Sequence, residues 1–374
     1  MGNKLRIKNL VVWAWLSWIT LAQCLAQKWE QVFIVEKRNH IWWNCYDYYE
    51  NWILVHKYWP HIFHTDMEEV RDYVNRFSEF TDYHHKVLWL IDWNLVPIPF
   101  NLNSIHLSFL DWQAWELEKS LLKYFDFDSK VTIWELRDKS ESVVDKNLSF
   151  LADYIFENVF KNYTMKQWWI SADEMASEVM ERVPVVISRN NHYFSDQKYQ
   201  WMPNEWYTTM FEKMLDNENI RVMLDTDYKD VIWEIEYEKL YVTSPIDEFF
   251  DNKYWELGYR KTLFKFETED VQSFQENSVI NYPNDYERTR ITEFKKFYPL
   301  SPIYDIEKTV ILKEYPWIWD IKSYPIWSQR DKKIFEKYNM ESKKLKNVYF
   351  FGRLGNYKYR DMDKVIKNVL DFFN

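Results

Sequence analysis

One stretch near the start of the chain, residues 9–38, constrains the fold more than any other. It reads NLVVWAWLSWITLAQCLAQKWEQVFIVEKR. The apolar run Leu10–Val12 predicts a first strand, the pattern over about 16–27 predicts a helix, and Val32–Val35 predicts a second strand. A strand, a crossover helix and a second strand at this spacing are typical of a parallel sheet. We therefore expect an α/β fold that begins with a βαβ unit.

The turn after the first strand departs from the pattern that such a unit needs in order to hold a dinucleotide. Glu36 ends the second strand about twenty positions past the turn, where the ribose of a dinucleotide needs an acceptor. The turn itself carries Trp13, Trp15 and Trp18 at the spacing G-x-G-x-x-G. Glycines there permit the turn, the close approach of a pyrophosphate and the packing of helix on strand, and an indole permits none of these. The sequence predicts a dinucleotide-binding fold with an altered fingerprint.

The same exchange runs through the whole composition. Ordinary usage of about 7% would give about 26 glycines in a chain of this length, whereas the 374 residues include 4 glycines and 22 tryptophans. The glycine shortfall thus matches the tryptophan count. Asn51-Trp52 and Asp92-Trp93 lie between apolar runs, where Asn-Gly or Asp-Gly marks a hairpin. We infer that most of the tryptophans, about 21, occupy positions built for glycine.

Length, charge and cysteine usage narrow the class of protein. A chain of 374 residues predicts about two or three domains. The net charge of −10 argues against a general nucleic-acid partner, because phosphate binding needs a basic face. Cys24 and Cys45 form neither a metal-ligand spacing nor a disulfide framework, which favours a reducing compartment.

Residues 9–26 have a rival interpretation as a signal peptide or short membrane anchor. Basic residues precede them, and the run is largely apolar. Thr20 and Gln23 interrupt the run, and a strand with an acidic end follows at once. These interruptions favour the βαβ unit over the anchor.

The histidines of the segment HKYWPHIFHT invite a metal-site interpretation. His56, His61 and His64 lie in an extended segment, and no carboxylate or cysteine completes a ligand set. We expect no metal, and we expect these side chains to line a polar site or the core.

Several further segments carry a resemblance when taken in order. They are VEKRNHIWWNCYD, HKYWPHIFHT, VPIPFNLN, YTMKQW, ERVPV with NNHYFSDQKYQ, SPIDEFFDNKYWELGYR, NSVINYPN, TRITEF, KEYP with SYPI, and FGRLGNYKYRDMDKVI. Together they make the chain similar, along nearly its whole length, to the UDP-galactopyranose mutase family.

The resemblance implies a flavoenzyme that interconverts UDP-galactopyranose and UDP-galactofuranose. FAD in its reduced form would be the cofactor and UDP-galactose the small-molecule substrate. The family's chemistry passes through a flavin N5–sugar iminium adduct without net redox, so the protein positions groups while the cofactor reacts. The resemblance further implies a cytoplasmic protein of polysaccharide biosynthesis with no membrane partner, and it leaves a homodimer open.

Site residues follow from the resemblance, motif by motif. A pyrophosphate that is both substrate charge and leaving group suits the forked guanidinium of arginine. The catalytic positions implied are Arg182, Arg290, His61 and His64, and the substrate-binding positions are Phe100, Tyr163, Trp168, Tyr193, Arg260, Tyr324 and Tyr359. The cofactor-binding positions are Trp13, Trp15, Leu16, Trp18, Glu36, Lys37, Arg38, Trp43, Asn44, Arg353, Asp361 and Met362.

The implied architecture is an α/β fold with three parts. A Rossmann-like FAD-binding domain is expected over 1–80, 203–245 and 340–374, an inserted helical domain over 106–182, and an antiparallel β-sheet domain over 81–105, 183–202 and 246–339. Two rivals to an active mutase stay open. One is an inactive or misfolded variant of that scaffold that cannot bind FAD, and the other is a membrane-anchored or secreted interaction protein that presents aromatic surface.

Overall fold

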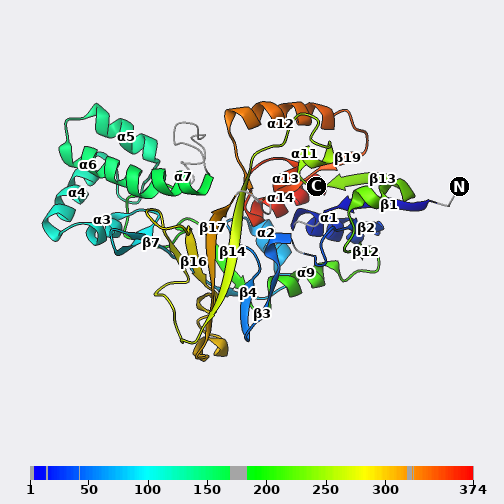
Figure 1. Ribbon diagram of the computed structural model, residues 1–374, viewed down its shortest axis with the longest axis horizontal. Helices are drawn as coiled ribbons and strands as arrows, with labels where there is room; N and C mark the ends of the chain where they lie inside the picture. Colours follow the sequence, from blue (N-terminus) through cyan, green and yellow to red (C-terminus); the bar gives the residue numbers. More distant parts are fainter. Residues whose placement is uncertain are drawn as a thin grey trace.

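The computed structural model describes residues 4–13, 16–41, 43–168, 183–317, 322 and 324–373. The molecule is elongated, and three parts follow one another along its length (Figure 1). Helices α3 to α7 form one end, a twisted antiparallel sheet occupies the middle, and a parallel sheet flanked by helices forms the other end.

The parallel sheet confirms the predicted βαβ unit. β1 (Leu5–Val12) leads through α1 (Leu16–Gln27) to β2 (Val32–Val35). β12 (Ile220–Met223), β13 (Ile235–Val242) and β19 (Val348–Phe350) complete a five-stranded sheet in the order β12-β2-β1-β13-β19, and every neighbouring pair is parallel. Helix α1 is buried at every position except Gln27, and it packs on α14 (Met362–Phe373). These contacts fix the position of its first turn.

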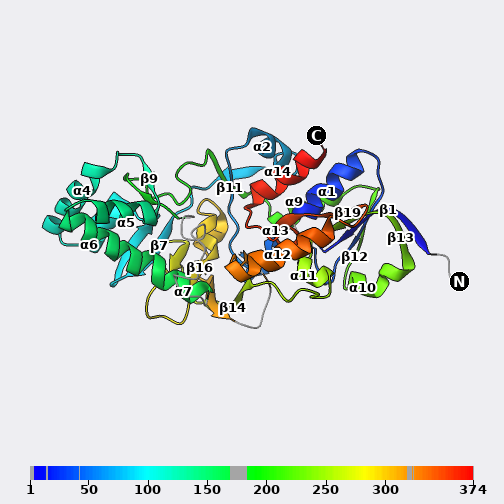
Figure 2. The same cartoon turned by 90° about the horizontal axis from the view of Figure 1, so that it is seen from above.

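Shorter elements surround this sheet. They are η1 (Trp43–Cys45), β3 (Asp47–Glu50), β4 (Ile53–His56), α2 (Glu68–Val74), α9 (Tyr207–Leu215), α10 (Tyr228–Val231), η4 (Ile232–Glu234), α11 (Ile246–Phe249), α12 (Gln329–Ser342) and α13 (Gly352–Gly355). Seen from above, α14, α13 and α12 follow one another across the molecule, on the side of the parallel sheet that faces away from the N-terminus (Figure 2).

Two hairpins take the turn that the sequence predicts. β3 and β4 pair up to Glu50 and Ile53, and Asn51 and Trp52 between them have φ of 49° and 67°. β7 (Val87–Ile91) and β8 (Asn94–Ile98) are joined by Asp92 and Trp93 with φ of 47° and 67°. Two positive φ values in a two-residue loop define the tight turn that favours Asn-Gly and Asp-Gly, so the prediction of hairpins here is confirmed.

The central sheet has seven strands in the order β18-β14-β17-β16-β15-β7-β8. Its members besides β7 and β8 are β14 (Tyr259–Glu269), β15 (Val279–Asn281), β16 (Arg290–Glu293), β17 (Thr309–Trp317) and β18 (Tyr324–Pro325), and only the β15–β7 pair is parallel. β5 (Phe63–Thr65), β11 (Tyr199–Pro203) and β6 (Phe80–Asp82) form a small sheet, and η5 (Phe294–Phe297) and η6 (Pro302–Asp305) follow β16.

The helical end begins at well-capped helices. The side chain of Asn101 caps α3 (Leu102–Ser108), and that of Thr132 caps α5 (Ile133–Ser142). Each belongs to a reciprocal capping box, which satisfies two backbone N–H groups that have no partner within the helix. The remaining elements are α4 (Asp111–Tyr124), α6 (Lys146–Ile155), η2 (Phe156–Lys161), α7 (Asn162–Trp168) and the β9 (Lys130–Val131) and β10 (Val185–Val186) pair. η2 is a π-helical turn that joins α6 to α7, so the three form one helix with a local change of register.

None of the helices in the described ranges has both the length and the apolar content needed to cross a lipid bilayer. The sheet-forming and helical segments alternate along the chain, and the division into three domains with the boundaries given above stays a prediction.

Candidate functional site

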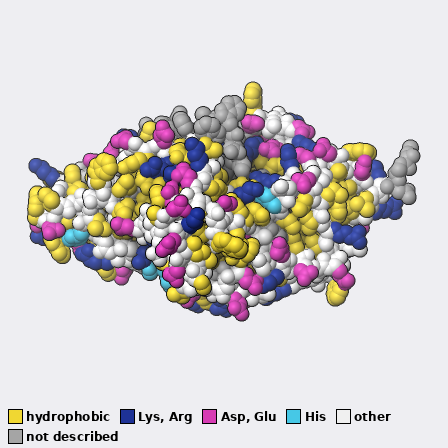
Figure 3. Space-filling view, turned by 60° about the horizontal axis from the view of Figure 1, so that its bottom comes forward, with side chains coloured by type: hydrophobic (Ala, Val, Ile, Leu, Met, Phe, Trp, Pro, Cys, Tyr) yellow, Lys and Arg dark blue, Asp and Glu magenta, His cyan; other side chains and the backbone are white. Residues whose placement is uncertain are grey.

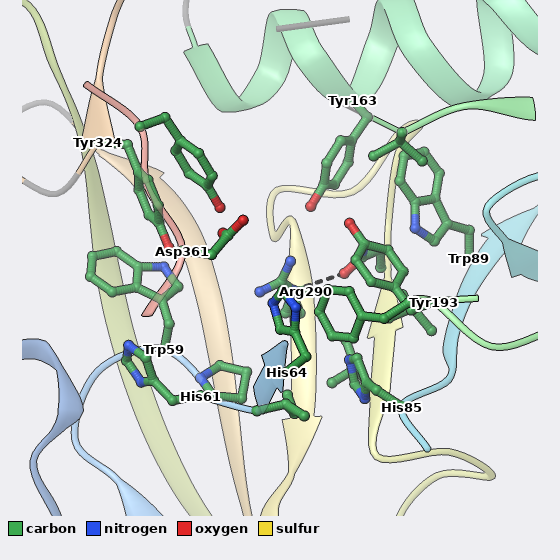
Figure 4. A pocket seen from close by; sticks show the side chains of 18 of the residues that line it. Trp59, His61, His64, His85, Trp89, Tyr163, Tyr193, Arg290, Tyr324 and Asp361 are labelled. Carbon is green, nitrogen blue, oxygen red and sulfur yellow. Dashed lines mark hydrogen bonds between the residues drawn. The ribbon is translucent and has the colours of Figure 1, made fainter. Parts of the chain in front are cut away.

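A cavity of about 250 Å³ lies where the central sheet, the helical end and the last helix meet. Figure 4 shows Arg290 at its centre, Tyr163 reaching down from α7, Asp361 and Tyr324 on one side, and Tyr193 and Trp89 on the other. The lining residues are Trp59, Pro60, His61, Ile62, His64, His85, Val87, Trp89, Val159, Phe160, Tyr163, Val183, Tyr193, Phe194, Arg260, Val279, Asn281, Arg290, Tyr324, Arg353, Tyr359, Asp361 and Met362.

Arg290 is held in place by its strand neighbours. Its Nε donates to Oδ1 of Asn281 at 2.9 Å, and its Nη1 lies 3.4 Å from Oε1 of Glu314. Burial by itself lowers the pKa of Arg290, but the carboxylate of Glu314 more than offsets it, so the pKa is raised. The guanidinium is therefore a fixed positive charge on the cavity wall.

Two further guanidinium groups share the wall. Burial lowers the pKa of Arg260, yet an arginine stays charged at physiological pH. The guanidinium of Arg353 donates to the carbonyl oxygen of Arg360 at 2.7 Å and lies over the ring of Tyr324, 4.3 Å from its centre. Tyr324 in turn stacks on Tyr359 at 5.3 Å between ring centres. The wall thus combines positive charge with phenol hydroxyls, the groups that bind a diphosphate.

His61 and His85 are neutral in the cavity. Burial, together with the charge of a nearby arginine, lowers the pKa of each to about 3. His64 stacks on Phe194 with 3.7 Å between ring centres. The positive charge of the site therefore comes from arginine, and the buried histidines supply polar but uncharged surface. No cluster of metal-ligating side chains occurs among the residues that the structure describes.

Aromatic rings form the far end of the cavity. The π-helical turn η2 places Val159 and Phe160 on the lining, and Tyr163 follows one turn later in α7. The ring of Tyr163 lies 4.4 Å from that of Trp89, at 41° between their planes. Flat apolar faces of this kind can stack on a nucleobase.

A second cavity, of about 270 Å³, lies at the carboxyl edge of the parallel sheet. Trp13 and Lys37 line it together with residues of the β12–α10 and β13–α11 connections, and Lys37 pairs with Asp227 at 3.1 Å. Glu36 is completely buried beside it and accepts the backbone N–H of Arg38 at 2.8 Å. A carboxylate at the end of the second strand is the ribose acceptor of dinucleotide-binding folds.

Neither cavity is large enough to hold a dinucleotide. The cavities share no lining residue, and each is smaller than the roughly 300–1,000 Å³ of ordinary small-molecule sites. Trp18 is fully buried in the first turn of α1, where a pyrophosphate would approach, and Trp59 is 3% exposed beside Arg353 and Tyr324. Asn44 and Ser244 are buried with side-chain oxygens that have no hydrogen-bond partner among the described residues. Polar groups suited to a cofactor are thus present, and Trp59 and Trp13 line the first and second cavities respectively.

The structure gathers most of the predicted site residues, but not all. Around the first cavity it brings together His61, His64, Tyr163, Tyr193, Arg260, Arg290, Tyr324, Arg353, Tyr359, Asp361 and Met362. Trp13, Leu16, Trp18, Glu36, Lys37, Arg38 and Asn44 lie at or beside the sheet edge. Phe100 is buried in the core at 1% exposure and does not line the cavity. Trp15 and Arg182 lie outside the described residues, and the side chains of Trp43 and Trp168 are not described.

Several residues of the site were not singled out from the sequence. Asn281 and Glu314 hold Arg290, and both stand in segments that carry the resemblance, NSVINYPN and KEYP. Phe194 stands in a third such segment, NNHYFSDQKYQ, whereas His85 lines the cavity from a loop that no local pattern marks. Trp59 is a further tryptophan in HKYWPHIFHT, and the tryptophan excess is the signal that could have marked it.

Comparison with known proteins agrees with this geometry. A family model described as UDP-galactopyranose mutase matches residues 158–359, and a model of an NAD(P)-binding Rossmann-like domain matches residues 18–77. The "Probable UDP-galactopyranose mutase" of Klebsiella pneumoniae is 33% identical over 376 residues, with 99% of this chain and 94% of that protein covered. The dTDP-fucopyranose mutase of Escherichia coli is 30% identical over 377 residues, with 97% of each covered.

A solved structure of reduced UDP-galactopyranose mutase superimposes with a TM-score of 0.68 at 14% identity, covering 98% of this chain and 96% of that one. At that identity the match supports the fold alone, and the family rests on the relatives and the family model. On these grounds the chain belongs to the UDP-galactopyranose mutase family.

Proposed function

We propose that the first cavity binds UDP-galactose and that the scaffold is that of a flavin-dependent mutase of the pyranose and furanose forms. The observation that carries this is Arg290, fixed by Asn281 and Glu314 among two more arginines and stacked tyrosines. Such a wall neutralises a diphosphate whether it is attached to the sugar or released from it.

Different residues of the first cavity contact different parts of the substrate. Arg290 and Arg260 take the diphosphate, and the hydroxyls of Tyr324 and Tyr359 donate to its oxygens. Tyr163 offers a face to the uracil ring at the helical end. His61 and His85 stay uncharged and exclude water from the floor of the cavity.

The flavin half of the site is different. The family's chemistry needs FAD in its reduced form, and the indoles at the sheet edge oppose that cofactor. We therefore propose that the chain binds the nucleotide sugar but retains little or no FAD, so that turnover is impaired. No catalytic step through the flavin follows from these side chains.

Titration calorimetry with UDP tests the substrate half. We expect saturable binding that weakens at least about tenfold in Arg290→Ala, since a charged hydrogen bond contributes about 1.5–3 kcal/mol. Arg330→Ala, at an exposed arginine of α12, is the matched control and should bind as the parent does. Absence of UDP binding by the folded parent would overturn the proposal, and full mutase turnover with FAD and dithionite would overturn its second half.

The sugar and base need a separate test, because a relative acts in its printed name on dTDP-fucopyranose. Competition of UDP-galactose against dTDP-fucose for the same cavity decides between them. We propose the uridine compound, because the residues matched by the family model include Tyr163, Arg260 and Arg290. A cytoplasmic location and a homodimer are retained as predictions.

A further inference from the structure

Left-handed backbone positions in this chain follow an unusual rule. Among the described residues, thirteen that are not glycine have positive φ. Asn and Asp, which tolerate this region, fill seven of them, and Tyr357 fills one. The other five are all tryptophan, namely Trp13, Trp29, Trp52, Trp93 and Trp255, with φ between 60° and 88°. A bulky side chain is strained in this region, which glycine enters freely.

Packing does not explain these tryptophans. Trp29, Trp52, Trp93 and Trp255 are 81%, 81%, 87% and 76% exposed. A side chain this exposed contributes almost nothing to the core, so it gains nothing in return for the strained backbone. Figure 3 shows hydrophobic side chains projecting from the outline of the molecule at several places.

The local motifs around them are glycine motifs. At the end of α1, the N–H of Trp29 donates to the carbonyl of Ala26 and that of Glu30 to the carbonyl of Leu25. This pair of hydrogen bonds defines a Schellman motif in which Trp29 holds the left-handed position usually taken by glycine. Trp52 and Trp93 hold the second position of two-residue hairpin turns, where Asn-Gly and Asp-Gly are favoured.

The same exchange reaches the cofactor edge. Trp13 has φ of 67° at the end of β1, and its N–H donates to the carbonyl of Val35 at 3.0 Å. Trp18 is buried in the first turn of α1 and Trp59 in the wall of the first cavity, and the buried side chains of Asn44 and Ser244 have polar atoms with no partner among the described residues. Exposed turns and the buried edge are thus affected alike, which selection for one local function would not produce.

We propose that these tryptophan positions are glycine positions, and that glycine at 13, 18 and 59 joins the two cavities into one site for FAD. The exchange is chain-wide because it arises in decoding. Some genetic codes read UGA as tryptophan and others read it as glycine, so one codon can place either residue at every such position. The inference rests on the proposed function only in naming the cofactor.

The test compares three full-length proteins. They are the chain as it stands, the variant W13G/W18G/W59G, and the control W112G/W115G/W233G, which removes exposed indoles from positions of ordinary backbone. After incubation with FAD and gel filtration, we expect a flavin spectrum near one equivalent in the first variant only. FAD retained by the parent, or a folded variant without FAD, would overturn the proposal.

A second measurement covers the case in which that variant fails to fold. Peptide mass mapping of the protein from its native cells reads positions 29, 52 and 93 directly. Glycine there supports the proposal and tryptophan overturns its decoding step. The proposed function fails separately, if the glycine variant binds FAD but does not convert UDP-galactofuranose.

A different observation concerns Lys166, which no part of the proposed function uses. Its ammonium Nζ donates to the carbonyl oxygens of Tyr282 at 2.9 Å, Asn284 at 3.3 Å and Arg288 at 2.6 Å. All three belong to the connection between β15 and β16. The amide of Asn162, one turn earlier in α7, donates to the side chain of Asn284 at 3.1 Å. Helix α7 is therefore hydrogen-bonded to both ends of the β15–β16 connection.

These hydrogen bonds lie immediately beside the first cavity. The rung next to Tyr282 is the pair Asn281 and Arg290, joined by the side-chain hydrogen bond that orients the guanidinium. Tyr163 precedes Lys166 by one helical turn on the same helix. Burial lowers the pKa of Lys166 to about 8, with the charge of Arg288 adding to the effect, so its three hydrogen bonds weaken in mild alkali.

We infer that Lys166 is a positioning residue. It locks α7, the helix of Tyr163, to the β15–β16 hairpin that carries Arg290, so that Tyr163 and Arg290 bind one nucleotide together. This rests on the proposed function for the identity of the nucleotide. The lock predicts that affinity for UDP depends on the charge of a lysine that does not touch the ligand.

Lys166→Met and the control Lys161→Met, at a half-buried lysine that pairs with Glu157, separate this role from general stability. We expect UDP affinity to fall about tenfold in Lys166→Met at pH 7. We also expect the parent's loss of affinity above about pH 8 to disappear in that variant. Unchanged affinity and an unchanged pH profile would overturn the inference.

If the parent binds no UDP, hydrogen exchange still decides the structural half. Amides of residues 282–289 should exchange faster in Lys166→Met than in Lys161→Met. Equal protection in the two variants would overturn the lock, whereas faster exchange with no UDP binding would leave the lock standing and contradict the proposed function.

Discussion

Arg290 and Asn281 face each other across the β15–β16 pair, and Nε of the arginine lies 2.9 Å from Oδ1 of the asparagine. Glu314, completely buried on the next strand, faces the same guanidinium at 3.4 Å. The site's central cation is thus oriented by two side chains, of which Asn281 also lines the cavity and Glu314 does not.

We predict that Asn281→Ala weakens UDP binding about tenfold while leaving the fold intact. Loss of this hydrogen bond frees the guanidinium to rotate, and a bond to a charged group contributes about 1.5–3 kcal/mol. Calorimetry on the variant and on Asn339→Ala, an asparagine of α12 away from the cavity, measures the effect. Equal weakening in both variants would contradict the role of Asn281.

We predict that Trp52→Gly and Trp93→Gly each raise the free energy of unfolding by about 1–2 kcal/mol. The gain comes from relief of the left-handed backbone, since both side chains are exposed and pack on little. Trp112→Gly is the matched control, because that tryptophan is also exposed but lies in the first turn of α4, where no left-handed backbone is relieved. Denaturant titration reads all three, and a loss of stability in the hairpin variants would contradict the expectation.

We predict that the protein loses stability as the pH falls below about 6.5. Burial holds the pKa of His56, His61 and His85 at about 3 in the folded chain. Between these values the unfolded chain binds protons that the folded chain does not, so the free energy of unfolding rises with pH over this window. Each histidine contributes up to about 1.4 kcal/mol per pH unit, and urea titrations from pH 4 to pH 7 measure the slope.

The titration of Asp47 lowers the free energy of unfolding as the pH rises, in the opposite direction to the histidines, so an Asp47 variant can test this account. Burial raises its pKa to about 6, although it accepts hydrogen bonds from the backbone N–H groups of Tyr207 and Thr208. The folded chain therefore holds this proton longer than the unfolded chain, and the contribution of Asp47 to stability is lost as the pH rises towards 6. Asp47→Asn should steepen the rise of stability with pH, and an unchanged slope would show that Asp47 does not titrate in this window.

We predict that Phe100→Leu lowers stability by about 1–2 kcal/mol and leaves UDP affinity unchanged. The sequence places Phe100 among the substrate-binding positions, but its ring is buried in the core and away from the cavity. Thermal unfolding and calorimetry on the same samples give both quantities. Weaker UDP binding with unchanged stability would restore Phe100 to the site.

The first βαβ unit was predictable because its signals are local. The apolar runs of β1 and β2, the helix between them and Glu36 follow from period and spacing, and the structure has the second strand at Val32–Val35 as expected. The two hairpin turns were equally predictable from Asn51-Trp52 and Asp92-Trp93, once tryptophan was taken to stand for glycine. The site was harder to predict, because Asn281, Glu314 and His85 meet Arg290 only after distant strands pair.

The sequence by itself determined the family, the parallel sheet and the tryptophan exchange, because motif order, hydrophobic period and composition can all be counted along the chain. Only the tertiary structure decided which tryptophans are strained and which fill the cofactor edge, because φ and burial depend on the whole packed chain. It likewise decided that Glu314 fixes Arg290, that His61 and His85 are neutral and that Lys166 joins α7 to the β15–β16 hairpin that carries Arg290. Each of these is a contact between residues far apart in sequence, and no local pattern encodes such contacts.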